Sequence, residues 1–342
     1  MTRYLLFCSK LYSLDILRPL AHAARAKGFE VAWFLRVGRE FLGPEEQVLS
    51  SAQDVINWSP DAVLVPGNWV PHFFPGLKVE VFHGFPIQKP PADRHFRIRG
   101  LFDLYCTQGP SSTGPFEELA AKHKHFRVRE TGWSKVDALF REEPRALPAD
   151  SERKTVLLGS TFSKRASCAP HLVEEIKRLA AKGSWRWFVT LHPKIETELV
   201  NRYRALEGPN LTFIETPNLL PAMKAADVML CDTSSIATEF LLQLRPVVTF
   251  RTVTPSPHLL DVTEVNEVEP AIAAALEPSS ELRQSIEEFA RQTHPYRDGR
   301  SAERVIEAVE EVRSMDSDSL RSKPIGVIRR LKARKKLRYW KP

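Results

Sequence analysis

The sequence predicts an α/β protein made of two Rossmann-like domains, and three observations support this prediction. The chain has 342 residues, more than one typical domain, and its 43% hydrophobic and 27% charged residues are ordinary for a globular protein. Strand-like and helix-like segments alternate in each half, which indicates parallel sheets covered by helices. A charged, proline-containing stretch at 141–154 separates the halves and is predicted to be a linker.

In the first half, short apolar runs predict the strands, and amphipathic segments predict the helices between them. The strands are expected at 3–9, 30–37, 62–66, 79–83, 101–107 and 127–131. The helices are expected at 13–27, 44–58 and 115–123, and the first of them stops at Gly28, a residue type that commonly ends helices. This half is the predicted N-terminal Rossmann-like domain, residues 1–140.

The same alternation restarts after the linker. Strands are expected at 155–160, 187–191, 211–215, 228–231 and 246–250. Helices are expected at 170–182, 194–206, 219–225, 235–244, 269–276, 280–293 and 301–314. Residues 155–315 are therefore predicted to form a C-terminal Rossmann-like domain. Ligands of such folds bind at the carboxyl ends of the strands, so we expect a site in a cleft between the domains.

The positive charge of the chain is concentrated at its end. Residues 321–342 carry ten Lys and Arg and no acid, and removing those ten from the net charge of +7 leaves −3 for residues 1–320. A body of that charge argues against nucleic-acid binding. Aliphatic and aromatic residues alternate with the cations, so 316–342 is predicted to be a basic amphipathic tail that contacts anionic lipid; a disordered, solubilising tail is the alternative.

Other sequence features argue against several classes of protein. No apolar run reaches the length of a membrane-spanning helix, and the start does not resemble a signal peptide, so we expect a cytoplasmic protein. The four cysteines are scattered and predict small buried hydrophobes rather than a zinc site or disulfides. Neither half contains GxGxxG or GxxxxGK[ST], which disfavours a dinucleotide oxidoreductase or a P-loop enzyme.

Two histidines end predicted strands. His83, in the segment FHGFPIQK, follows an apolar strand, and Gly84 beside it permits a tight turn or a close backbone approach. A neutral imidazole there can take a proton from a hydroxyl, although a loop histidine that only bonds a backbone carbonyl is the plainer alternative. His192 lies between a strand end and a helix start, where it can reach a bound phosphate.

Hydroxyl and basic side chains follow two further strands of the second half. In the segment CDTSSIATEF, Thr233, Ser234 and Ser235 precede a helix and can donate to a pyrophosphate, unless they only cap the helix. Glu239 lies one turn into that helix and can accept ribose hydroxyls. In STFSKR, Lys164 and Arg165 can neutralise a diphosphate, or can form an ordinary solvated loop.

The order of these motifs resembles the CDP-glycerol glycerophosphotransferases, a family of teichoic-acid and capsule enzymes. The resemblance rests on HG with Lys89, TGWSKVD at 131–137, STF at 160–162, HP at 192–193, DTSS at 232–235, RP at 245–246 and DGRSAERV at 298–305. It implies a GT-B-like fold with two domains facing across a cleft, in which residues 1–140 form the acceptor side and residues 155–315 bind the donor nucleotide. The sequence departs from the family in FHGFPIQK for WHGTPLK, GWSK for GYPR, STFSKR for PTxR and DTSS for DYSS.

The resemblance also implies a function and site residues. It implies a transferase that moves glycerol phosphate, or a related polyol phosphate, from a CDP-linked donor to a membrane-anchored polymer or glycolipid at the inner face of the membrane, without a cofactor or metal. It implies three sets of site residues. The catalytic pair is His83 and His192. The donor-binding residues are Thr161, Lys164, Arg165, Thr233, Ser234, Ser235 and Glu239, and the residues that support the acceptor or its loop are Gly84, Lys89 and Lys135.

Three alternatives remain open. The first is a GT-B glycosyltransferase that uses a nucleotide sugar. The second is an enzyme like the non-hydrolysing UDP-N-acetylglucosamine 2-epimerases, which the stretch from Thr249 to Pro255 after Glu239 resembles. The third is a catalytically inert nucleotide-binding protein.

Overall fold

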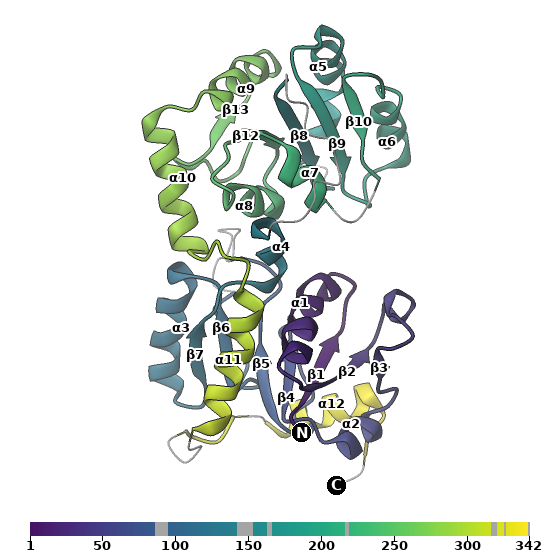
Figure 1. The fold of residues 1–342 in the computed structure, drawn as a ribbon, viewed down its shortest axis with the longest axis vertical. Coiled ribbons are helices and arrows are strands. Elements are labelled where there is room, and N and C mark those ends of the chain that lie inside the picture. The colour runs from purple at the N-terminus through teal and green to yellow at the C-terminus, as the bar shows by residue number, and fades with distance from the viewer. Residues whose placement is uncertain are drawn as a thin grey trace. The chain divides into compact units, whose positions relative to one another are not determined.

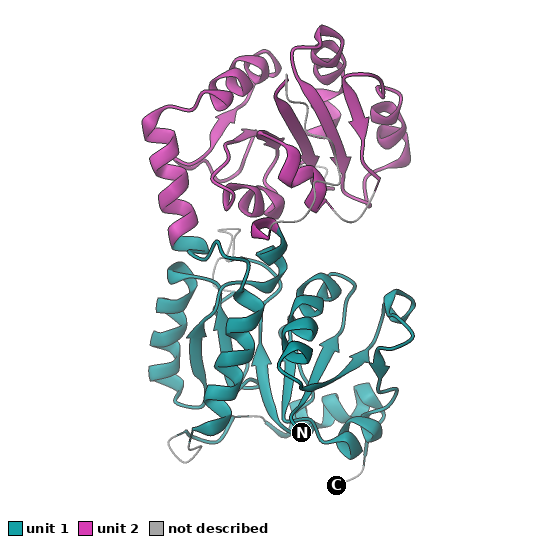
Figure 2. Cartoon of the chain, viewed as in Figure 1, with its two compact units in different colours: residues 1–86, 90–138, 292–342 teal, residues 87–89, 139–291 magenta. Residues whose placement is uncertain are grey.

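The computed structural model describes residues 1–85, 95–141, 153–162, 166–215, 219–315, 320–324 and 326–340. The chain divides into two compact units (Figure 2). Unit 1 comprises the described parts of 1–86, 90–138 and 292–342, and unit 2 the described parts of 139–291. Most of the predicted linker lies outside the described residues.

Unit 1 is built on a seven-stranded parallel sheet (Figure 1). In spatial order its strands are β3 (Gln47–Val48), β2 (Glu30–Leu35), β1 (Arg3–Cys8), β4 (Ala62–Val65), β5 (Leu77–Glu80), β6 (Leu104–Thr107) and β7 (Arg127–Glu130). This is the doubly wound 3-2-1-4-5-6 order with one added strand. The direction of winding reverses between β1 and β4, and ligands of such sheets bind at the carboxyl ends of those two strands.

Helices cover both faces of this sheet because successive strand side chains point to opposite sides. On one face, α1 (Ser13–Ala26) packs against α11 (Ser301–Ser314). On the other, Leu5 and Phe7 of β1 lie in one core cluster with Val55, Phe116 and Tyr339. These three belong to, or directly follow, α2 (Ala52–Trp58), α3 (Pro110–His123) and α12 (Val327–Leu337). Short turns complete the unit at η1 (Arg39–Phe41) and η3 (Ser134–Val136), and α4 (Asp137–Phe140) begins in it.

Unit 2 repeats the plan with a six-stranded parallel sheet. Its strands, in spatial order, are β10 (Leu211–Phe213), β9 (Arg186–Leu191), β8 (Thr155–Ser160), β11 (Val228–Cys231), β12 (Val247–Phe250) and β13 (Leu260–Val262). The winding reverses between β8 and β11. The core on one face joins the sheet to α5 (Ala169–Lys182), α6 (Thr197–Arg204) and α9 (Val268–Leu276). The unit also contains α7 (Leu220–Ala225), α8 (Ser235–Leu241), η4 (Val265–Glu267) and most of α10 (Ser280–Thr293).

The predicted α/β class with two parallel sheets is confirmed, and the structure moves several boundaries. Helix α11 belongs to unit 1, not to the domain expected at 155–315, because its buried residues pack on α1. The helix expected at 44–58 begins only at Ala52. Ser51 caps it through a reciprocal bond with Asp54, and Gln47–Val48 pairs with β2 as an edge strand.

The four cysteines are free and buried, as expected. The basic tail is not a separate element, because α12 packs on unit 1: Ala333 is buried, and the Tyr339 ring stacks on Phe73 with 5.0 Å between centroids. None of the helices in the described ranges combines the length and the apolar character required to cross a bilayer.

Candidate functional site

The carboxyl ends of β8 and β11 are joined by the fully buried carboxylate of Asp232. The Ser160 hydroxyl donates to it at 2.7 Å, and the backbone N–H groups of Thr161 and Cys168 donate at 2.9 and 3.0 Å. Several hydrogen bonds satisfy a buried carboxylate, and here they fix the two strand ends relative to each other. Asp232 therefore organises the winding-reversal point of unit 2.

The hydroxyl-rich segment after β11 divides into two parts. The Thr233 hydroxyl lies 2.9 Å from the Thr252 hydroxyl and accepts from the N–H of Val253, so it stabilises the turn after β12. Ser234 occupies the N-cap position of α8 but makes no side-chain capping bond. Within the described residues the Ser234 and Ser235 hydroxyls have no hydrogen-bond partner, and Ser235 is exposed. These two hydroxyls can donate to a ligand.

His192 directly follows β9, the strand that pairs with β8 in the sheet of unit 2. Its Nδ1 accepts from the backbone N–H of Lys194 at 3.1 Å, so the proton of the neutral ring is on Nε2. The ring packs on Phe162 with 4.5 Å between centroids, and the Lys194 ammonium lies over the same Phe162 ring. Partial burial lowers the pKa of His192, and Lys194 lowers it further. His192 is thus a neutral N–H donor near pH 7.

The other predicted donor-binding residues are Thr161, Lys164, Arg165 and Glu239, and the structure describes two of them. The Thr161 backbone is fixed by Asp232, and its half-buried side chain lies at the end of β8. Glu239 is half-buried on α8. Lys164 and Arg165 lie outside the described residues. The carboxyl edge of unit 2 therefore brings together Thr161, His192, Ser234 and Ser235 as polar groups at consecutive or neighbouring strand ends.

In unit 1, His83 lies just beyond β5 on a strained backbone. Phe82, the residue before it, is buried and has a positive φ of 57°, which is rare for a bulky side chain. Its carbonyl accepts from the Trp133 indole N–H at 3.3 Å. The Nδ1 of His83 lies 3.1 Å from the Pro66 carbonyl after β4, and the Tyr12 ring stacks on the imidazole at 5.6 Å. The residues after β1 and β4 thus fix the orientation of the ring.

These contacts also set the protonation of His83. Since a carbonyl only accepts, Nδ1 carries the proton, and Nε2 has a free lone pair in the neutral ring. Partial burial lowers the pKa of His83; the Pro66 carbonyl opposes this, and the Arg99 and Lys10 cations lower it further. The ring is exposed to solvent on its remaining surface. His83 is therefore poised as a base near pH 7.

The predicted support residues have different environments. The Gly84 carbonyl accepts from the side-chain amide of the fully buried Gln108 at 2.6 Å, which fixes the turn after His83. The Lys135 ammonium lies 5.4 Å from the centre of the Trp133 ring. Lys89 lies outside the described residues.

Three motifs of the sequence resemblance have structural roles instead. TGWSKVD and DGRSAERV meet inside unit 1, where Gly132 leaves no room for a side chain beside Ser301. The N–H of Trp133 also donates at 3.0 Å to Nε2 of His294, which precedes the second motif. In RP, the Arg245 guanidinium donates to the carbonyls of Met223, Lys224 and Ala226 at the end of α7.

Sequence reasoning did not assign roles to Asp232, Tyr12, Pro66 or Gln108. For Asp232, a signal was present, since an acid that directly ends a buried strand requires partners at the sheet edge. The other three lie far from His83 in the sequence, and only the fold brings them to it.

The sequence of this chain is similar to one known protein family. A family model described as UDP-N-acetylglucosamine 2-epimerase matches residues 117–310. No curated protein matches the sequence.

Among solved structures, MnaA of S. aureus with UDP gives a TM-score of 0.62 at 15% identity, covering 91% of this chain and 96% of that one. A crystal structure of UDP-N-acetylglucosamine 2-epimerase gives 0.63 at 14%, with 94% and 99% coverage. The wall teichoic acid polymerase TagF gives 0.65 at 13%, with 91% and 89% coverage. At such identities these likenesses establish a shared GT-B-like fold and nothing more.

These findings correct the family expected from the motifs. The match over 117–310 is to the epimerase family, so membership of the CDP-glycerol glycerophosphotransferases is wrong. The functions drawn from it are wrong as well: glycerol phosphate transfer from a CDP-linked donor, a membrane-anchored acceptor and teichoic-acid or capsule synthesis. The motifs misled because each is short, and because this chain shares its fold with both TagF and the epimerases.

Proposed function

The chain belongs to the UDP-N-acetylglucosamine 2-epimerase family, and we propose that it binds a UDP-linked N-acetylhexosamine and inverts the configuration at C2 of the sugar. The family match over 117–310, more than half of the chain, is the observation that carries this proposal. The proposal assigns no step to a metal or an organic cofactor.

Unit 2 is proposed to bind the UDP part of the substrate. Its carboxyl edge offers the Nε2–H of neutral His192 and the hydroxyl groups of Ser234 and Ser235 as hydrogen-bond donors. Such donors suit the oxygens of a diphosphate. Glu239 on the adjacent helix is proposed to accept from the ribose hydroxyls. The MnaA structure, which has the same fold and contains UDP, supports the choice of UDP as the nucleotide.

Unit 1 is proposed to supply proton transfer. No carbonyl adjoins C2 of the sugar, so a base can remove the C2 proton only if the electron pair of the C2–H bond forms a C1=C2 double bond and expels UDP from C1. Return of UDP to C1 and of a proton to the opposite face of C2 then completes the inversion. His83 is the proposed base because its Nε2 lone pair is free in the neutral ring and because the lowered pKa keeps that ring neutral at working pH.

The test is to incubate the purified full chain with UDP-N-acetylglucosamine in D₂O and to follow the sugar signals by proton NMR. We expect the C2 epimer to appear with deuterium at C2, since a proton that leaves the carbon exchanges with solvent. Release of free nucleotide without epimer or deuterium would contradict the proposal, and so would an unchanged substrate in a preparation that binds UDP.

A further inference from the structure

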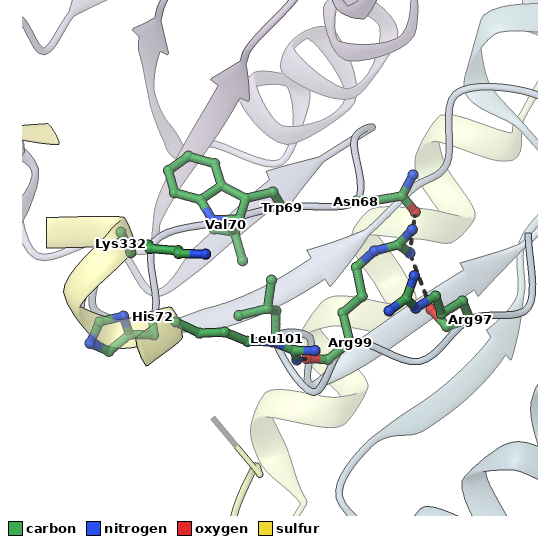
Figure 3. Close-up of a pocket in the computed structure, with 10 residues that line it drawn as sticks. Asn68, Trp69, Val70, His72, Arg97, Arg99, Leu101 and Lys332 are labelled. Atoms are coloured by element: carbon green, nitrogen blue, oxygen red, sulfur yellow. Dashed lines mark hydrogen bonds between the residues drawn. The ribbon is translucent and has the colours of Figure 1, made fainter. Parts of the chain in front are cut away.

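A pocket lies within unit 1, and none of the residues that line it was assigned to the proposed site above. It encloses about 460 Å³, within the range of roughly 300–1,000 Å³ usual for small-molecule sites. The residues after β4, the residues before β6 and helix α12 form its walls (Figure 3). Ten residues line it: Asn68, Trp69, Val70, His72, Arg97, Arg99, Leu101, Arg329, Lys332 and Ala333.

The fold leaves this space open for a specific reason. Residues 66–76 connect the parallel strands β4 and β5 without a helix, so this part of the sheet lacks the cover that a crossover helix normally gives. Helix α12 covers it instead. Ala333 of α12 is buried, and the Lys336 ammonium lies 3.8 Å from the centre of the Trp69 ring. The pocket is the gap that remains under the helix.

Four of the lining residues are permanent cations, and none is an acid. In the described parts of the chain, Arg97, Arg99, Arg329 and Lys332 form no ion pair with a carboxylate. Arg99 donates to the Asn68 side chain at 3.0 Å and to the Arg97 carbonyl at 3.1 Å, and Arg329 donates to the Arg99 carbonyl at 2.6 Å. Like charges gathered without counter-charges repel one another, and a bound anion removes this cost.

The nearest buried carboxyl group does not neutralise these cations. Burial raises the pKa of Glu80 well above its usual range, although Arg99 opposes the shift, and this favours the uncharged form of the carboxyl group. His72 is neutral near pH 7, since burial and the Arg330, Arg334 and Lys78 cations lower its pKa. The pocket therefore has a strong net positive charge with one neutral imidazole in its wall.

The remaining wall is apolar. Trp69, Val70 and Leu101 also line the pocket, and Figure 3 shows their side chains among those of Arg99 and Lys332. A bare inorganic ion would leave this surface uncovered. A ligand that carries both a phosphate and a carbon skeleton would contact both kinds of wall.

We propose that this pocket binds a soluble phosphorylated metabolite of the sugar-phosphate or nucleotide class, with its phosphate against Arg97, Arg99, Arg329 and Lys332. This ligand is separate from the substrate of the proposed function, and the two assignments can fail independently.

The test uses the full chain with its UDP site saturated by UDP, and pyrophosphate as the titrated probe in calorimetry. The double variant Arg97→Glu and Lys332→Glu reverses two exposed cations of the pocket. The control, Lys122→Glu and Lys335→Glu, makes the same change in net charge at exposed positions of unit 1 that do not line it. We expect one pyrophosphate site, weakened at least about tenfold in the pocket variant and little changed in the control.

Equal weakening in both variants would show a general charge effect and would overturn the proposal, as would the absence of any pyrophosphate site beside bound UDP. A second arm measures sedimentation with phosphatidic acid vesicles. Retention that depends on Arg97 and Lys332, without pyrophosphate binding in solution, would assign the phosphate to a lipid headgroup and overturn a soluble ligand. Loss of the catalytic reaction alone bears on the proposed function and not on this pocket.

Discussion

His83 and His192 both follow parallel strands, yet their backbone contacts give the two rings opposite hydrogen-bonding roles. The Pro66 carbonyl places the proton of His83 on Nδ1, which leaves Nε2 as a base. The Lys194 N–H places the proton of His192 on Nε2, which makes that nitrogen a donor. One carbonyl and one N–H therefore distinguish the proposed proton-transfer residue from the proposed phosphate-binding residue of the same type.

The His83 assignment predicts a specific pH dependence. Because its pKa is lowered, kcat/KM should fall only when the pH drops below the ordinary histidine pKa, as the ring becomes protonated. His83→Gln should reduce kcat by about 100-fold or more and abolish that acidic limb. Both are measured from pH–rate profiles of epimer formation. A limb centred above the ordinary histidine pKa, or one retained in the variant, would contradict the role.

The His192 assignment predicts an effect on binding. His192→Ala should weaken UDP affinity by about tenfold, since one N–H donor to a charged oxygen is lost, and calorimetry measures this directly. His22→Ala, which removes an exposed histidine of α1, is the control and should leave UDP affinity unchanged. Equal affinities in wild type and His192→Ala would remove this residue from the phosphate site.

Among the elements, α11 depends on a carboxylate from outside the helix. The buried Asp137 accepts from the first two N–H groups of α11, those of Ser301 at 2.9 Å and Ala302 at 2.8 Å. No side chain of the preceding residue caps this helix. The negative charge of Asp137 also suits the positive end of the helix. The two sequence motifs that contain these residues therefore form one structural junction.

Asp137→Asn should lower the free energy of unfolding by about 1–3 kcal/mol, because the amide places an N–H₂ group against a helix N–H. Urea unfolding at neutral pH measures this. Asp298→Asn is the matched control: it removes an exposed ion pair with Arg304 at the same end of α11 and should cost less than about 1 kcal/mol. Similar losses in both variants would mean that Asp137 contributes only surface charge.

At the same scale, the sequence predicts most elements and misses those that depend on distant partners. Short runs such as VLL within 155–160 and VMLC at 228–231 identify buried strands because they are uninterrupted apolar segments. The edge strands Gln47–Val48 and Leu260–Val262 are short and half-exposed, so no pattern indicates them. Periodicity identifies α11 as a helix but cannot tell which sheet it covers.

Across the whole molecule, the fold is better determined by the sequence than the function is. Both units wind in the same order, so alternation alone predicts two parallel sheets and the strand ends where polar side chains gather. Strand-end residues such as His83 and His192 could therefore be proposed from the sequence. The substrate could not, because TagF and the epimerases share the architecture, and only the match over 117–310 separates the families.

The C-terminal segment shows how the whole fold changes the meaning of a sequence pattern. A basic stretch with aromatic residues predicts a lipid-binding tail, but Tyr339 is only 8% exposed and stacks on Phe73, whereas the adjacent Trp340 is 61% exposed. The Arg334 guanidinium lies 5.3 Å from the centre of the same Phe73 ring. The segment thus completes the core of unit 1.

Tyr339→Ala should therefore destabilise the protein by about 2–4 kcal/mol, since a buried aromatic side chain and its stacking partner are lost. Trp340→Ala removes a larger but exposed ring and should change the free energy of unfolding by less than about 0.5 kcal/mol. Urea unfolding of the two variants compares them, and hydrogen exchange should show the Tyr339 effect in residues 66–76. The reverse order of losses would mean that α12 does not belong to the core.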